Sequence, residues 1–250
     1  MDLSVYEIED EIEAVHWWFV GRRRLLAREL ALAGAASSWR MLDLGSGTGG
    51  NLRLLRDLKF PSRFGTDVSP VAAASCVRKN LAPMLLADAT NLPFADGTFD
   101  LVMAMDVLEH IERDDLAAAE IRRILRPNGI AIITVPAFAA LWGPQDVLSH
   151  HLRRYRMRSL MKLLKAAGFT SLRRYYFNFI LFLPILAARR FLNASKAELR
   201  SENELNSPVL NAILRRLFNI DVGTAPYLRP PFGVSICAVL RADPAAADIR

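Results

Sequence analysis

Apolar and polar positions along the chain repeat with the two periods that distinguish strands from helices. Short continuous apolar runs predict strands buried on both faces. Between them, apolar residues three and four positions apart predict helices that pack one face on a sheet. The strands predicted in this way are 41–44, 63–67, 84–87, 99–105, 130–135, 171–176 and 234–240, and the helices between them include 70–79, 114–125 and 158–167. This alternation indicates an α/β fold with a doubly wound sheet.

The regular alternation is interrupted at both ends of the chain. Two helices are expected before the first strand, and the aromatic run 16–19 between them either folds over a ligand as a lid or packs into the core. A helical and apolar insertion late in the chain predicts a cap over a substrate site. The predicted segments are N-terminal helices 1–40, core 41–177, insertion 178–232, last core strand 233–241 and a disordered tail 242–250.

Composition narrows the class of protein. With 250 residues, 52% of them hydrophobic and 23% charged, the chain can bury a sizeable core and is neither disordered nor fibrous. Two distant cysteines exclude a disulfide framework and a cysteine-built zinc site, and they fit a reducing compartment. The N-terminus is acidic and the longest apolar run, 177–188, is too short to span a bilayer. A cytoplasmic protein is therefore expected.

A glycine-rich turn follows the first strand directly. Strand 41–44 runs into Gly45-Ser-Gly-Thr-Gly-Gly50, and a helix follows, which is the arrangement of a nucleotide-binding loop. Asp67 ends the next strand, where its carboxylate can accept hydrogen bonds from both hydroxyls of a ribose. The loop also satisfies the G-x-G-x-x-G pattern of dinucleotide sites. By itself it therefore leaves an NAD(P)-binding oxidoreductase as an alternative.

Further motifs follow the loop in a fixed order. With them the chain resembles class I S-adenosylmethionine (SAM)-dependent methyltransferases, in the group that includes ubiquinone and menaquinone biosynthesis methyltransferases. This resemblance covers about residues 40–136 and implies a seven-stranded Rossmann-like sheet with SAM as cofactor. The motifs that carry it are Leu42-Asp-Leu-Gly-Ser-Gly-Thr-Gly-Gly50, Gly65-Thr-Asp67-Val-Ser69, Ala87-Asp88-Ala89, Leu92-Pro-Phe94, Phe99-Asp100 and Leu125-Arg-Pro-Asn-Gly129.

The resemblance also implies which residues hold the cofactor. Those around the glycine turn would line its methionine part, Asp67 would bind the ribose, Asp88 the adenine amino group, and Met105 and Asp106 would face the sulfonium. The alternative for Asp43 and Asp88 is that they are turn or capping carboxylates. The complete set implied for the cofactor is Asp43, Gly45, Gly47, Gly49, Asp67, Val68, Asp88, Ala89 and Met105.

Transfer of a methyl group to oxygen or carbon calls for a base near the acceptor. Asp106 after the fourth strand, and His150, His151 and Tyr155 after the fifth, are the candidates, with a solvated basic loop as the alternative for the last three. The run 106–110 resembles the Glu-x-x-Glu-His of ubiquinone-type O-methyltransferases, where it is tied to a divalent metal. Because Glu-His at this place is common in the wider group as a structural pair, no metal is predicted.

Charge and apolar character point to the acceptor. The net charge is +6 with a pI near 9.7, and arginine pairs flank the apolar run 175–188. This pattern favours a small or lipid-like acceptor and contact with an anionic membrane, so the inner membrane surface is a second expected location. The alternative is that the apolar run is a buried segment of the core. Nucleic acid is not favoured, because the basic run 153–158 includes a single aromatic residue. The function predicted is methyl transfer from SAM to oxygen or carbon of such an acceptor, with an RNA or other anionic substrate and a non-catalytic SAM-binding subunit as alternatives.

Overall fold

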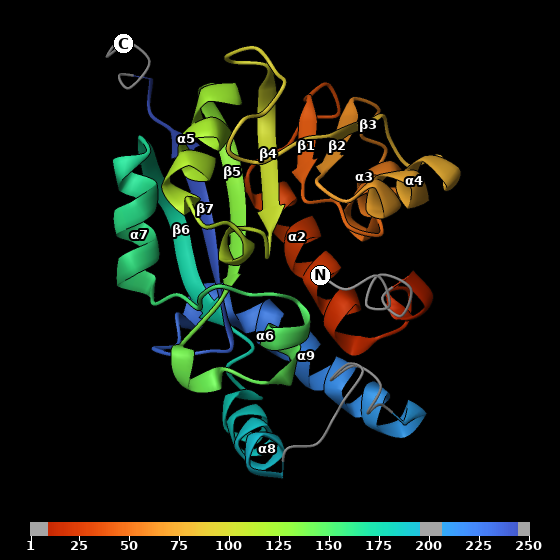
Figure 1. Cartoon of the computed structure of the whole chain (residues 1–250), viewed down its shortest axis with the longest axis vertical. Coiled ribbons are helices and arrows are strands. Elements are labelled where there is room, and N and C mark those ends of the chain that lie inside the picture. Colours follow the sequence, from red (N-terminus) through yellow and green to blue (C-terminus); the bar gives the residue numbers. More distant parts are fainter. Residues whose placement is uncertain (1–9, 196–206, 245–250) are drawn as a thin grey trace.

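A seven-stranded sheet forms the centre of the computed structural model, which describes residues 10–195 and 207–244 (Figure 1). The strands lie in the order β3-β2-β1-β4-β5-β7-β6, and of the described strands only β7 is antiparallel to its neighbours. The predicted α/β class is confirmed. The strands are β1 (Met41–Leu44), β2 (Arg63–Asp67), β3 (Met84–Leu86), β4 (Phe99–Met105), β5 (Leu125–Pro136), β6 (Phe169–Phe177) and β7 (Ser235–Ala242).

Helices cover both faces of this sheet. They are α2 (Trp17–Leu32), α3 (Gly50–Asp57), α4 (Pro70–Arg78), α5 (Asp114–Ile124), α6 (Pro144–Leu148), α7 (Met157–Ala166), α8 (Phe182–Ser195) and α9 (Pro208–Leu228). From β1 the chain adds β2 and β3 on one side of the sheet, and it then returns to add β4 and β5 on the other side. The carboxyl ends of the strands at such a switch point border a ligand crevice. Figure 1 places α6, α8 and α9 beyond the carboxyl ends of β4 and β5.

The continuous apolar runs are explained by two separate hydrophobic layers. Successive side chains of a strand point to opposite faces, so Val102 packs with α5 and α7, whereas Leu101 and Met103 pack with α2 and α9. All three are completely buried. A strand between two helical layers therefore has no polar side, which is why its sequence shows no alternation.

Helix α9 belongs partly to the core, although residues 178–232 were predicted to form a single insertion. The ring of Phe218 on α9 packs against α2, where a Cβ on Gly21 would come within 2.1 Å of it. Glycine is needed there because the two helices cross so closely. The aromatic run 16–19 was predicted to lie between two helices, but α2 already begins at Trp17 and continues through Gly21, because packing against α9 outweighs the low helix propensity of glycine.

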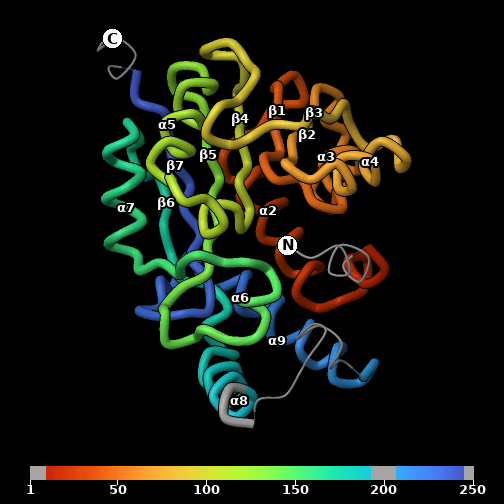
Figure 2. The backbone as a smooth tube through the Cα atoms, viewed as in Figure 1, coloured from red at the N-terminus to blue at the C-terminus, as the bar shows by residue number. Residues whose placement is uncertain are grey.

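The rest of the predicted insertion projects from the sheet. In Figure 2, α8 and the first half of α9 lie away from the strands. No helix of the described residues is long and apolar enough to cross a membrane. The start of the predicted first helix, at residues 1–9, and the end of the predicted tail, at 245–250, lie outside the described residues.

Candidate active site

One cavity of about 890 Å³ lies at the carboxyl ends of β1, β2 and β4. The glycine loop and the ends of β2 and β3 line one part of it, and residues from α6, α8, α9 and the start of β7 line another. Cavities of this size hold a ligand of several hundred daltons. Because the two parts are continuous, two ligands bound in them could touch each other.

The glycine loop holds three residues in left-handed backbone conformations. The φ angles are 70° at Gly45, 52° at Gly47 and 93° at Gly49, a region that only glycine enters without strain. No heavy atom lies within 4 Å of a Cβ built on Gly47, whereas one on Gly49 would meet Leu81 at 2.3 Å. Gly45 and Gly47 line the cavity, and Gly49 lies behind them as the N-cap of α3.

Asp67 at the end of β2 connects the loop to the next helix. Its Oδ2 accepts a hydrogen bond from the Gly47 amide at 2.8 Å, and its Oδ1 accepts one from the Ser69 amide at 2.8 Å. The side chain is buried but lines the cavity. Each carboxylate oxygen can accept a second bond, so Asp67 can hold the loop and a ligand hydroxyl together.

The other residues predicted to hold the cofactor lie along the same part of the cavity, with one exception. Val68, Asp88, Ala89 and Met105 all line it. The carboxylate of Asp88 accepts bonds from the Thr90 amide and hydroxyl, both at 2.8 Å, and these bonds lower the pKa of Asp88. Asp43 is the exception, because it lies behind the loop.

Asp43 is completely buried beneath the glycine loop. Its Oδ1 accepts a hydrogen bond from Asn51 Nδ2 at 3.1 Å, and its Oδ2 has no hydrogen-bond partner among the described residues. Burial raises the pKa of this carboxyl to about 7. The carboxylates that line this part of the cavity are those of Asp67 and Asp88, which fit a ligand that carries a positive charge and ribose hydroxyls.

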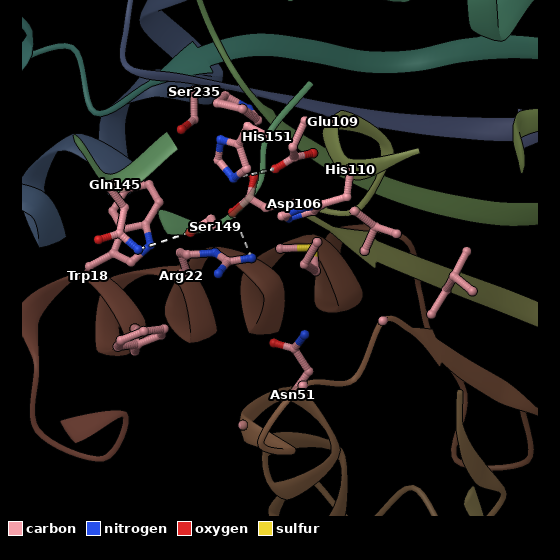
Figure 3. Close-up of a pocket in the computed structure, with 18 of the residues that line it drawn as sticks. Trp18, Arg22, Asn51, Asp106, Glu109, His110, Gln145, Ser149, His151 and Ser235 are labelled. Carbon is pink, nitrogen blue, oxygen red and sulfur yellow. Dashed lines mark hydrogen bonds and ion pairs between the residues drawn. The ribbon is translucent and has the colours of Figure 1, made fainter. Parts of the chain in front are cut away.

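Glu13 and Arg22, near the N-terminus, also build the site, and sequence patterns did not indicate either of them. The Thr48 hydroxyl of the glycine loop donates to the buried Glu13 at 2.6 Å. Arg22 of α2 reaches Asp106 at 2.9 Å, and Figure 3 shows this guanidinium opposite Asn51. Trp18 stacks on Phe218 and also lines the cavity, so the predicted alternatives of lid and core both apply to it.

A carboxylate–histidine pair faces the other part of the cavity. His151 Nδ1 lies 2.7 Å from Oδ1 of Asp146, a residue of α6 that sequence analysis did not single out. Burial alone would raise the pKa of Asp146, but the bond from His151 and the charges of Arg154 and Arg189 outweigh it and lower the pKa to about 2. Ionised Asp146 can only accept, so Nδ1 donates and Nε2 is the ring nitrogen that can take up a proton.

Glu109 lies next to this pair. Its side chain is completely buried, and neither of its oxygens has a hydrogen-bond partner among the described residues. His151 Nε2 is 3.9 Å from its Oε1, and Figure 3 shows the two side chains pointing toward each other. Burial, and then the negative charge of Asp106, raise the pKa of Glu109 well above its usual value. Glu109, His110 and His151 bring one potential ligand atom each to within 4.8 Å of the others.

The other predicted catalytic residues lie in different surroundings. The Tyr155 hydroxyl is buried outside the cavity and donates to Asp114 at 2.7 Å, and burial raises its pKa. This environment does not suit a base, because the hydroxyl keeps its proton and does not face the acceptor. His150 is exposed and also lies outside the cavity. Asp106 lines the cavity but forms the ion pair with Arg22.

Comparisons with known proteins decide which ligand the glycine loop serves. Residues 42–133 match the family described as "Methyltransferase domain". The chain contains a class I SAM-dependent methyltransferase domain. This match resolves the choice between SAM and NAD(P) that the loop leaves open, and SAM is the cofactor of the domain.

Curated relatives share this domain. A ubiquinone/menaquinone biosynthesis C-methyltransferase (UbiE) of Cupriavidus necator is 30% identical over 124 residues, which are 47% of this chain and 50% of that protein. A malonyl-[acyl-carrier protein] O-methyltransferase of Geobacter sulfurreducens is 35% identical over 117 residues, 44% of this chain and 43% of the relative. The matches thus span about half the length of these curated relatives. The methyltransferase fold is shared with them, and their acceptors differ from each other.

Solved methyltransferase structures match nearly the whole chain. One is the complex between the Haloferax volcanii Trm112 methyltransferase activator and a methyltransferase, with a TM-score of 0.64, 19% identity and 96% coverage of both chains. Another is the Haemonchus contortus phosphoethanolamine N-methyltransferase 2 with SAM, with a TM-score of 0.60, 19% identity, and coverage of 88% of this chain and 52% of that one. At this identity, the likeness concerns the fold alone.

Proposed function

We propose that this chain transfers the methyl group of SAM to an oxygen or carbon atom of a small, largely apolar acceptor. One observation carries the proposal: a single cavity joins the glycine loop of the methyltransferase domain to the Asp146–His151 pair. A cofactor held by the loop and an acceptor beside His151 would meet within this cavity.

The residues around the loop fit the cofactor. The open space beside Gly47 leaves room for its methionine part. Asp67 would accept from the ribose hydroxyls, and Asp88 and Val68 would hold the adenine. When bound, SAM supplies an electrophilic methyl group on a positively charged sulfonium. The acidic side chains of this part of the cavity favour that charge.

His151 would act on the acceptor. His151 lines the cavity with Nε2 3.9 Å from Glu109 Oε1, and the bond from Nδ1 to Asp146 sets the orientation of the ring. As the new bond to the methyl carbon forms, Nε2 would take the proton that the acceptor oxygen or carbon releases. The carboxylate of Asp146 then stabilises the imidazolium that results.

The apolar character of the acceptor is inferred from the far part of the cavity. Helices α8 and α9 contribute mostly aliphatic side chains there, in contrast to the acidic cofactor part. A molecule that fills this part would bury apolar surface, which stabilises binding. The aliphatic lining residues from the two helices are Ile185, Ala188, Leu192, Leu210 and Leu214.

We also propose that the outer surface of α8 and α9 contacts an anionic bilayer. Leu183 and Phe191 on α8 are 67% and 73% exposed, and Val209 on α9 is 72% exposed. Within the described parts of these helices the only carboxylate is the buried Asp221, whereas the arginines at 190, 215 and 216 are exposed. Apolar side chains between exposed arginines suit a bilayer interface with anionic headgroups.

The structure divides the four arginines that flank the apolar run, because Arg174 and Arg190 are exposed and the other two are not. Arg173 forms an ion pair with buried Glu29 at 2.8 Å, and Arg189 is buried beside Asp146, so neither is available to lipid phosphates. Leu181 is buried, and Phe182 packs on Phe138. Arg189, Leu181 and Phe182 face inward and anchor α8 to the rest of the molecule, whereas Arg173 ties β6 to α2.

The proposed function is tested by calorimetric binding of S-adenosylhomocysteine. Wild type is expected to bind it, and Asp67→Ala to weaken binding by about 10- to 100-fold, as for a lost hydrogen bond of ~1.5–3 kcal/mol to a charged group. Asp57→Ala removes an exposed carboxylate and serves as the control. An unchanged affinity for Asp67→Ala would contradict the ribose assignment.

Other outcomes separate the alternative functions. Binding of NAD(P) in place of S-adenosylhomocysteine would contradict methyl transfer. A protein that binds S-adenosylhomocysteine but releases none from SAM in a broad screen of acceptors would be a non-catalytic binding subunit. Turnover of RNA alone would contradict the apolar acceptor.

Bilayer contact is tested by co-sedimentation with liposomes. We expect binding to vesicles that contain anionic phospholipid, weaker binding to neutral vesicles, and loss at high salt, because exposed charge contacts are screened. Phe191→Glu should reduce binding, since it places a charge in the apolar surface. Val77→Glu, at a 60% exposed position on α4, is the matched control. Equal sedimentation of Phe191→Glu and wild type would contradict the proposed surface.

A further inference from the structure

Asn178 is a buried polar residue of the cavity wall whose side chain has no protein partner. It is 1% exposed and follows β6 directly. Neither its Oδ1 nor its Nδ2 forms a hydrogen bond with any described residue. The side chain lines the same cavity as His151 and Ser235. A buried carboxamide normally has partners, because leaving its donors and acceptor unsatisfied costs stability.

The backbone of Asn178 is held firmly in place. Its amide donates to Asp221 Oδ1 at 2.6 Å, and its carbonyl accepts from the Val234 amide at 3.3 Å. The φ angle is 58°, a left-handed conformation in which asparagine and glycine are the most favourable residues. These contacts account for the conformation of the main chain. They give no role to the carboxamide, since glycine would serve the backbone equally well.

Asn178 lies at the end of β6, next to strand ends that border the acceptor part of the cavity. Phe177, the preceding residue, is paired with Ser235 of β7, and Ser235 is also paired with Pro136 at the end of β5. Figure 3 shows Ser235 beside His151. The ends of β5, β6 and β7 thus bring a carboxamide and a hydroxyl to one region, and the imidazole of His151, which follows α6, lies beside that hydroxyl.

Each arginine of this region already faces a carboxylate, which argues against an anionic ligand. Arg22 pairs with Asp106 at 2.9 Å, Arg154 with Asp146 at 2.8 Å, and Arg189 lies 3.4 Å from Asp146. An anionic group would have to compete with these carboxylates. A neutral carboxamide, by contrast, donates and accepts hydrogen bonds without adding charge.

We propose that Asn178 binds an uncharged polar group of the acceptor, one that presents both a hydrogen-bond acceptor and a donor, such as an amide or a hydroxyl next to a carbonyl. The inference deepens the proposed function and rests on it for the role of the bound molecule. The acceptor would then be amphipathic. Its uncharged head would lie against Asn178, beside His151, and its apolar body along α8 and α9.

Two probes of equal length and different charge test the assignment. Octanamide carries an uncharged head with a donor and an acceptor, and octanoate replaces it by an anion. We expect calorimetry with S-adenosylhomocysteine present to give tighter binding of octanamide than of octanoate by wild type. Asn178→Gly keeps the left-handed backbone and removes the carboxamide, and it should weaken octanamide binding by about tenfold or more.

Controls distinguish recognition from stability. Asn128→Gly makes the same change at an exposed position with a φ angle of 64°, and it should leave octanamide binding unchanged. Asn178→Gly should keep the wild-type melting temperature and affinity for S-adenosylhomocysteine.

Three results would overturn the assignment: failure of wild type to bind octanamide, tighter binding of octanoate, or equal octanamide binding by Asn178→Gly. Joint loss of octanamide and S-adenosylhomocysteine binding in Asn178→Gly would also overturn it, because it would indicate a structural role. Failure of wild type to bind S-adenosylhomocysteine contradicts the proposed function instead; octanamide binding that still depends on Asn178 supports the present assignment in that case.

Discussion

Replacing His151 by glutamine is expected to lower kcat for methyl transfer by about 10²- to 10⁴-fold, the usual contribution of a positioned general base. Glutamine keeps a polar side chain of similar length, but its amide cannot take up a proton at neutral pH. The affinity for S-adenosylhomocysteine should stay as in wild type, because the glycine loop and Asp67 are untouched. Release of S-adenosylhomocysteine, measured with an acceptor identified by screening, gives the rate.

The neighbouring histidine provides the matched control. His150 is exposed and lies outside the cavity, so His150→Gln should retain the wild-type rate. Asp146→Asn should lower kcat as well, because an amide no longer favours the tautomer in which Nε2 of His151 is free to accept. Full activity of His151→Gln would contradict its role as the base.

Replacing Asp43 by asparagine is expected to remove a large part of the pH dependence of stability in the protein without cofactor. Burial raises the pKa of Asp43 from its ordinary value of 3.8 to about 7. As pH rises above 3.8, the unfolded chain releases this proton while the folded chain retains it, so stability falls until the pH passes 7. Asparagine mimics the protonated carboxyl and carries no such loss.

The difference between the two proteins gives the magnitude. The free energy of unfolding of Asp43→Asn relative to wild type should increase between pH 4 and pH 8 by on the order of 2–4 kcal/mol, from ~1.4 kcal/mol per pKa unit. Chemical denaturation at both pH values measures it, and other titrating groups cancel in the comparison. Asp57→Asn, at an exposed carboxylate, should show no such increase. Parallel pH profiles for Asp43→Asn and wild type would contradict a buried, proton-retaining Asp43.

Most strands could be predicted from the sequence because their signal is local. The run 99–105 coincides with β4, since each of its side chains packs into one of the two hydrophobic layers. Predictions that depend on contacts between distant parts of the chain were less accurate. The predicted insertion 178–232 merged part of a core helix with projecting elements, because the close crossing at Gly21 and Phe218 involves residues far apart in the chain.

The same distinction applies to the site. Gly45, Gly47 and Asp67 could be singled out because a strand, a glycine turn and the next strand end occur within one short stretch of sequence. Asp146 and Asn178 could not, because an isolated carboxylate or amide carries no pattern until its neighbours are known. His151 was one of several candidates, and its contact with Asp146 and its place in the cavity wall distinguish it from His150.

The sequence by itself determined the α/β class, the positions of most strands and the cofactor loop, because hydrophobic period and backbone freedom are properties of neighbouring residues. Only the tertiary structure decided which polar side chains share the cavity and which are paired elsewhere. Arg173 and Tyr155 are turned inward to Glu29 and Asp114, whereas Asn178 and His151 face the cavity. Burial and pairing depend on segments that meet only when the chain folds, and they determine the chemistry available to a side chain.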